Sequence, residues 1–124
     1  MKRDLLWALL AASSAMSCVR GDNTPIACAA YAVAGVSVDV TNAATAGPIC
    51  DATVTITDGS YSERLLETSC RFVGAHERPG TYVVRAERTG FVSKEVGSVR
   101  VVTSGGDCPH VREVRLAMPL LPED

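Results

Sequence analysis

Apolar and polar residues alternate over much of the chain after residue 36. The alternation is clearest over residues 36–40, 52–57, 82–87, 99–102 and 114–118. In the first of these segments, valines alternate with a serine and an aspartate. A period of two places successive side chains on opposite faces, which is typical of half-buried β-strands. The pattern therefore predicts short strands with one face in a core and the other in solvent.

Turns, loops and one less regular segment separate these strands. Glycine-containing turns or loops stand at 58–59, 79–80, 89–90 and 104–107. Residues 63–73 alternate less cleanly, although Cys70 and Phe72 can share a face opposite Arg71. No window of helical length shows an amphipathic helical pattern. About seven short strands at this spacing predict an all-β domain, a sandwich or a barrel.

The first residues read as an export signal. Lys2 and Arg3 precede an apolar run at 5–12, and small residues follow it. This order is typical of a secretory signal peptide, and the run is far shorter than the roughly 20 residues that span a bilayer. We expect residues 1–17 to be the signal peptide, with a buried N-terminal helix as the alternative. Export would place the protein in an oxidising compartment.

The cysteine count is odd and suggests a lipid anchor. The cysteines are Cys18, Cys28, Cys50, Cys70 and Cys108. Residues 15–18 are similar to a bacterial lipobox, with Ala15 where leucine is usual. Acylation of Cys18 would leave an even number of cysteines and make 18–27 a lipidated tether, whereas ordinary signal cleavage would leave a thiol. With Val19 after the cysteine, resemblance to known lipoproteins implies an outer-membrane destination.

Composition narrows the class of protein further. The 124 residues suggest one domain, and 47% are hydrophobic but only 5% aromatic. A core built mainly of valine is thin for this length, so covalent staples would help it. The formal net charge is −2, with no basic cluster along the chain. A nucleic-acid partner is therefore not expected.

Three sequence elements follow one another along residues 36–118. They are 36–40 followed by 46–49 and 51–54, 79–84 followed by Ala86 and 90–91, and 99–101 leading to 114–116. In this order they resemble the carboxypeptidase regulatory-like domain family. The resemblance implies a seven-stranded Greek-key β-sandwich of the prealbumin (transthyretin) type over residues 28–124. It also implies a folding, docking or binding role without catalysis. The cysteines depart from the plain family pattern and look more like a subgroup in small bacterial lipoproteins.

The Pro-Gly-Thr-Tyr and Gly-Phe elements of this resemblance make physical sense. We expect Gly80 to free a turn before a strand whose Tyr82 packs inward. Gly90 should let the backbone swing so that Phe91 closes one end of the core. A residue with a β-carbon at a left-handed turn would cost about 1 kcal/mol or more.

Four cysteines allow three disulfide connectivities. We favour Cys50–Cys70, because Cys50 opens the strand at 52–57 and Cys70 lies on a strand returning to the same end. We favour Cys28–Cys108, because these residues precede the first and last strands, which can lie side by side in the topology implied by the resemblance.

No catalytic or metal-binding constellation is recognised. His110 and Glu113 match the His-x-x-Glu zinc pair, but residues three apart at the head of a strand point to opposite faces, and no histidine follows. His76, beside Glu77, reads as a solvated loop histidine. Asp51, Asp58 and Asp107 read as turn caps rather than calcium ligands. The serine-hydrolase elbow and the Tyr-Arg-Gly-Ser ending of transthyretin-like hydrolases are absent from the sequence. We therefore expect no enzyme activity, cofactor or metal.

The expected function is that of a non-enzymatic exported lipoprotein. The domain would be an interaction or structural module at a bacterial membrane, with an unknown protein or cell-envelope partner. The alternatives are a carbohydrate-binding sandwich and an accessory domain of a secreted hydrolase system. Sugar binding needs exposed aromatic rings, but Trp7 lies in the expected signal peptide, and Tyr82 is expected to be buried. Tyr31 and Tyr61 remain as candidates.

Overall fold

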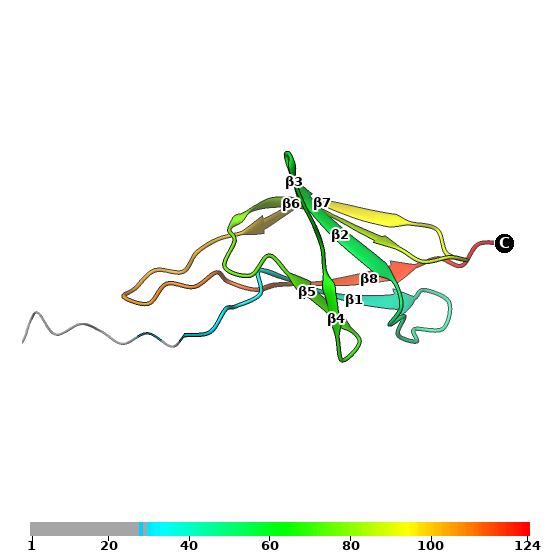
Figure 1. Ribbon diagram of the computed structural model, residues 1–124. Helices are drawn as coiled ribbons and strands as arrows, with labels where there is room; N and C mark the ends of the chain where they lie inside the picture. Colours follow the sequence, from blue (N-terminus) through cyan, green and yellow to red (C-terminus); the bar gives the residue numbers. More distant parts are fainter. Residues whose placement is uncertain (1–27, 29) are drawn as a thin grey trace, which may run out of the picture.

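The structure, a computed structural model, describes Cys28 and residues 30–124 as an all-β domain (Figure 1). None of these residues forms a helix that could span a membrane. The eight strands are β1 (Val36–Asn42), β2 (Thr53–Asp58), β3 (Tyr61–Arg64), β4 (Leu66–Thr68), β5 (Arg71–Gly74), β6 (Gly80–Glu87), β7 (Lys94–Val101) and β8 (Val114–Leu120). The all-β class predicted from the sequence is therefore confirmed, with eight strands in place of seven.

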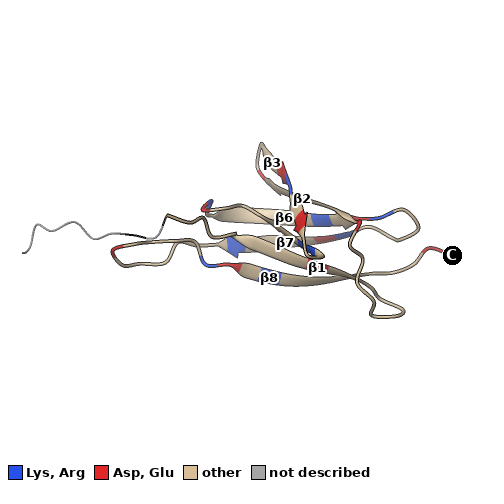
Figure 2. Ribbon diagram, turned by 60° about the horizontal axis from the view of Figure 1, so that its bottom comes forward, with Lys and Arg blue, Asp and Glu red and all other residues tan. Residues whose placement is uncertain are grey.

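The strands form two four-stranded sheets that pack face to face, consistent with a β-sandwich. The first sheet has the order β4-β5-β1-β8, and the second has the order β3-β2-β6-β7. Strand β1 runs parallel to β8, with Val36 opposite Val114 and Asn42 opposite Leu120, so the first and last strands do lie side by side. The other pairs are antiparallel. Figure 2 shows the sheets as two layers, with acidic and basic residues interspersed over both.

The eighth strand comes from the segment whose alternation was unclear. Strand β3 pairs with β2 in the second sheet, whereas β4 and β5 form a hairpin in the first. The chain crosses between the sheets at Leu65, whose N–H donates to the Val54 carbonyl at 2.8 Å. A change of sheet interrupts the period of two, which explains the irregular pattern. Ser69 and Cys70 form the hairpin turn with φ angles of 51° and 63°, so the expectation that Cys70 continues a strand is wrong.

Valine is the most frequent residue of the core between the sheets, with eight of the 18 buried hydrophobic residues among the described part of the chain. The largest fully buried side chains of this core are Tyr82, Ile56 and Met118. Tyr82 packs inward as expected, and its hydroxyl donates to the Arg78 carbonyl at 2.7 Å. The same hydroxyl accepts a hydrogen bond from Nη1 of Arg78 at 2.9 Å. Both hydrogen-bonding capacities of the buried hydroxyl are therefore used, which offsets its desolvation.

The two glycines of the family-like motif have different roles. Gly90 has a φ of +89°, and Phe91 after it packs half-buried against the core, as expected. Gly80, however, is the first residue of β6 and has no left-handed conformation. A β-carbon there would lie 2.5 Å from Oδ2 of Asp58, so glycine provides space rather than a turn. The left-handed residues of this loop are Ala75 and Glu77.

Candidate functional site

The four described cysteines form two disulfides. Cys50 is bonded to Cys70 and Cys28 to Cys108, which is the pairing favoured from the sequence. The α-carbons are 4.6 Å apart in the first bridge and 5.5 Å apart in the second. Such distances are normal for disulfides. Cys18, the signal segment 1–17 and the remainder of the tether at 18–27 lie outside the described residues.

The Cys50–Cys70 bridge connects the two sheets on one side of the core. Cys50 lies in the turn before β2, and Cys70 lies in the turn between β4 and β5. Cys50 therefore belongs to the approach to the second sheet, and Cys70 to a hairpin of the first. The bridge acts across the layers rather than within one sheet.

The Cys28–Cys108 bridge lies on the long connection between β7 and β8. This connection, residues 102–113, is a hairpin-like extension in which Thr103 and Val111 form an isolated antiparallel β-bridge. The two arms of the extension are also joined by backbone hydrogen bonds. The Ser104 N–H donates to the His110 carbonyl at 2.7 Å, and the Arg112 N–H donates to the Val102 carbonyl at 2.8 Å. In Figure 1 the extension (orange) projects at the end of the molecule opposite the C-terminus, beside the start of the described chain.

Glu77 joins three chain segments at the base of this extension. Its Oε2 accepts a hydrogen bond from the Val33 N–H at 2.9 Å, and its own N–H donates to the Val33 carbonyl at 2.9 Å. Its Oε1 accepts from the Val111 N–H at 3.1 Å. Its Oε2 also lies 2.5 Å from Nδ1 of His110. One loop carboxylate thus holds the N-terminal segment, the extension and the β5–β6 loop together.

The environment of Glu77 favours its ionised form. The hydrogen bond with His110 is the main cause that lowers the pKa of Glu77, followed by the bond from the Val33 N–H. Partial desolvation opposes this by raising the pKa, and the Val111 N–H lowers it further. The His110 ring stacks on the Tyr31 ring, with centroids 4.7 Å apart and planes inclined by 18°. The stack is a direct contact between the extension and the N-terminal segment, in addition to the Cys28–Cys108 disulfide.

A histidine whose Nδ1 meets a carboxylate also occurs in catalytic and metal sites, because the other ring nitrogen then acts as a base or ligand. The surroundings of His110 do not complete such a site in the part of the chain that the structure describes. No group of three or more metal-ligating side chains gathers there. Ser104 lies nearby, but its Oγ accepts from the His110 backbone N–H at 3.2 Å. The observed contacts of the pair are those of a structural clamp.

The structure places the other sequence candidates differently. His110 lies in the connection before β8, not at the head of a strand, and its carboxylate partner is Glu77 rather than Glu113. Glu113 pairs with Arg115 at 3.3 Å. The His-x-x-Glu spacing therefore brings no pair together. His76 is exposed in its loop, as expected.

Two of the three candidate aspartates, Asp51 and Asp58, form ion pairs with arginines. Asp51 forms a bidentate pair with Arg88, at 3.0 Å to Nε and 2.8 Å to Nη2. Hydrogen bonding to Arg88 lowers the pKa of Asp51, and the same contact raises the pKa of Arg88. Asp58 lies 3.2 Å from Nη1 of Arg78. Sequence reasoning missed these pairs because their members lie 37 and 20 residues apart.

A cluster around Arg78 was also not foreseen. The guanidinium lies 3.6 Å above the centre of the Tyr61 ring, a cation–π contact. The Tyr61 hydroxyl donates to Oε1 of Glu63 at 2.7 Å, which raises the pKa of Tyr61. The same oxygen accepts from the Ala75 N–H at 3.1 Å, so Glu63 links β3 to the end of β5. Tyr61 and Glu63 are two residues apart on β3, but the contacts with Arg78 and Ala75 form only when distant segments of the chain pack together.

The fold and the cysteine pairing define a small, disulfide-bonded all-β domain. No protein-family model matches the chain, and no curated protein matches its sequence. The two disulfides are compatible with an exported protein. The function must therefore be inferred from the residues and their arrangement.

Proposed function

We propose that this chain is an exported lipoprotein that presents a β-sandwich interaction or structural module at a bacterial membrane. The observation that carries the proposal is that four of the five cysteines are paired in disulfides. Two disulfides use Cys28, Cys108, Cys50 and Cys70, which leaves Cys18 as the fifth cysteine of the sequence. That cysteine follows a signal-like segment at the position where lipoproteins are acylated. An outer-membrane location is the destination that Val19 favours.

The positions of the chain ends support this proposal. The described chain starts beside the 102–113 extension, and the C-terminus lies at the opposite end of the long axis (Figure 1). A domain tethered through its N-terminal end would direct the opposite end away from the membrane. That end carries the loop at 43–52 and the turn at 88–93.

Membership of the carboxypeptidase regulatory-like family, with a Greek-key prealbumin-like topology, is part of the same proposal. This part of the proposal is supported by the conformation and packing of the residues in the motif that carries the resemblance. Tyr82 is buried, Gly90 has positive φ, and Phe91 packs on the core. Such modules accompany other domains without catalysing reactions, and a fold alone assigns no chemistry. We propose that Glu77 and His110 act here as a clamp and not as a catalytic pair.

The carbohydrate-binding alternative has no observation in its favour. Tyr31 is 58% exposed, but one face of its ring already stacks on His110. Tyr61 lies beneath the Arg78 guanidinium, and Tyr82 is fully buried. A sugar stacks on one face of a ring, and Tyr31 is the only exposed tyrosine or phenylalanine ring among the described residues, so no platform of several rings is formed. The role of accessory domain to a secreted hydrolase likewise gains no specific support.

Metabolic labelling of the full chain tests the proposal. The wild-type protein and the Cys18→Ser variant are expressed in a Gram-negative host that is fed an alkyne analogue of palmitate. We expect the wild-type protein to carry the label and to sediment with membranes, and Cys18→Ser to lose both properties. A matched Ser17→Ala variant retains the small residue before the cysteine and should behave as wild type. An unlabelled wild-type protein would overturn the proposal.

A further inference from the structure

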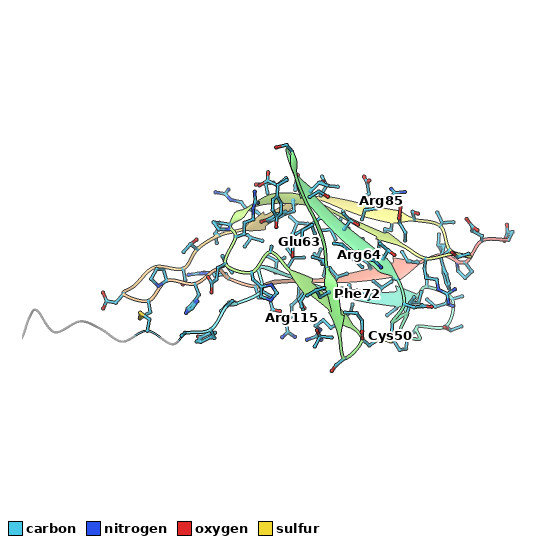
Figure 3. The ribbon with its side chains drawn as sticks, in the orientation of Figure 1. Cys50, Glu63, Arg64, Phe72, Arg85 and Arg115 are labelled. Atoms are coloured by element: carbon cyan, nitrogen blue, oxygen red, sulfur yellow. A yellow bond between two sulfur atoms is a disulfide. The ribbon has the colours of Figure 1, made fainter. Side chains whose placement is uncertain are left out.

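A shallow depression opens between the two sheets where the chain crosses from β3 to β4. Its volume is about 540 Å³. Ala52, Leu65 and Phe72, which are buried core residues, line its floor. Figure 3 shows Phe72, Arg64 and Cys50 along this opening between β2 and β4. The depression therefore exposes part of the apolar core at one side of the domain.

Covalent and hydrogen bonds hold the rim of this depression. The Cys50–Cys70 disulfide ties the approach to β2 to the β4–β5 turn. The Leu65 N–H bonds to the Val54 carbonyl at 2.8 Å and ties the crossing segment to β2. A rim fixed at both ends is pre-organised, so little conformational freedom is lost when a ligand binds.

Strand β4 offers an unpaired backbone edge beside the depression. It is the outermost strand of the first sheet and pairs only with β5 among the described strands. Thr68 and Arg71 flank the two-residue turn and form a hydrogen-bonded pair in such a hairpin. The N–H and C=O of Glu67 therefore point away from β5. Leu66, next to it, is 68% exposed.

The rim carries one arginine and two carboxylates, and Arg64 is the one of the three without a partner among the described residues. Asp51 is engaged by Arg88, and Oε2 of Glu67 accepts from the Cys70 N–H at 2.6 Å. Arg64 lines the depression, and within residues 30–124 it has no carboxylate partner at ion-pair distance. An occupant with a carboxylate near Arg64 would complement this charge.

We propose that this depression binds an extended segment of a partner protein that carries an aliphatic residue and a glutamate or aspartate two positions apart. The segment adds to β4 as a strand and exchanges two hydrogen bonds with the Glu67 backbone. Residues two apart in a strand share a face, so the aliphatic side chain covers the floor while the carboxylate meets Arg64. The site rests on the proposed interaction role of the domain, but it does not depend on the lipid anchor.

Peptide titration of the exported full chain carrying Cys18→Ser tests this site without the anchor. The probes are acetyl-Thr-Val-Thr-Glu-Thr-amide and the same peptide with lysine in place of glutamate, followed by backbone amide shifts. We expect the acidic peptide to shift the Leu66, Glu67 and Thr68 amides and to bind about tenfold more tightly than the basic one. The Arg64→Glu variant should reverse that preference.

Matched variants separate the site from general surface effects. Arg100→Glu changes an arginine on β7 and should preserve the preference for the acidic peptide. Leu66→Asp should abolish binding, whereas Val83→Asp, at an exposed apolar position on β6, should preserve it. Equal binding of the two peptides, an unchanged preference in a folded Arg64→Glu protein, or binding by neither peptide would each overturn the proposal. Failure here with successful Cys18 labelling would leave the anchored module intact.

Discussion

Oε2 of Glu77 lies 2.5 Å from Nδ1 of His110, which is 33 residues further along the chain. The same carboxylate holds Val33 and Val111 through their backbone N–H groups. Glu77 itself has a left-handed φ of 51°, a conformation that costs free energy for a residue with a β-carbon. The contacts of its side chain therefore compensate a local backbone cost.

The Glu77→Gln substitution should lower the melting temperature at neutral pH. The lowered pKa of Glu77 means that its carboxylate stabilises the folded state above the ordinary value of 4.5. This contribution is lost as the pH falls through the lower folded-state pKa. The difference in melting temperature from wild type should therefore be full at neutral pH and shrink in acid.

Melting curves recorded across the acidic range by circular dichroism provide the measurement. Glu113→Gln is the matched control, because Glu113 forms an exposed pair with Arg115 and holds no backbone segment. It should leave the melting temperature nearly unchanged. A pH-independent effect of Glu77→Gln would contradict the clamp.

The two disulfides should contribute unequally to stability. Chain-entropy arguments give about 3 kcal/mol for a loop of 20 residues and about 4–5 kcal/mol for one of 80, the separations of Cys50–Cys70 and Cys28–Cys108. The double variant Cys28→Ser with Cys108→Ser should therefore unfold at lower urea concentration than Cys50→Ser with Cys70→Ser. The opposite order would show that the inter-sheet bridge matters more than loop length.

Removing the buried hydroxyl of Tyr82 should destabilise the fold. Tyr82→Phe loses the hydrogen bonds that the hydroxyl makes with the Arg78 carbonyl and guanidinium, at about 1 kcal/mol or more. Tyr31→Phe, which keeps the ring stacked on His110, should change stability little. Equilibrium urea unfolding measures both, and an equal response of the two variants would argue against a specific role of the Tyr82 hydroxyl.

Replacing Ser37 should stabilise the fold, in contrast to the Tyr82→Phe substitution. Its side chain is 1% exposed, and its Oγ has no hydrogen-bond partner among the residues that the structure describes. A buried polar atom without a partner costs about 1–3 kcal/mol, so Ser37→Ala should stabilise the protein by about 1 kcal/mol. The same urea measurement applies. A loss of stability would mean that the hydroxyl has a partner in solution.

Local patterns predicted most of the strands, whereas the cysteine pairing also drew on the topology that the resemblance implies. Alternation located β1, β2, β6 and β8, because each keeps one face in the core along its length. The pairing of Cys28 with Cys108 was favoured correctly once the first and last strands were placed side by side. Strand β4 was not foreseen, because the crossing at Leu65 interrupts the alternation.

The contacts of the candidate sites could not be predicted in the same way. Glu77 meets His110 only after the long connection folds back along the N-terminal segment. The Asp51–Arg88 pair likewise joins loops that meet at one end of the sandwich. Such contacts depend on the packing of the layers and have no period or spacing in the sequence. The alternation of side chains between the two faces of a strand, by contrast, follows from backbone geometry alone.

Intact-mass analysis of the protein purified from membranes tests the central claim most directly. The account predicts a mature chain beginning at Cys18, with the added mass of a diacylglycerol on that residue. It also predicts that reduction raises the mass by the hydrogens of two disulfides. A chain that begins elsewhere, or one that carries no lipid mass, would contradict the anchored module, and free thiols at all the described cysteines would contradict the disulfide-stabilised fold.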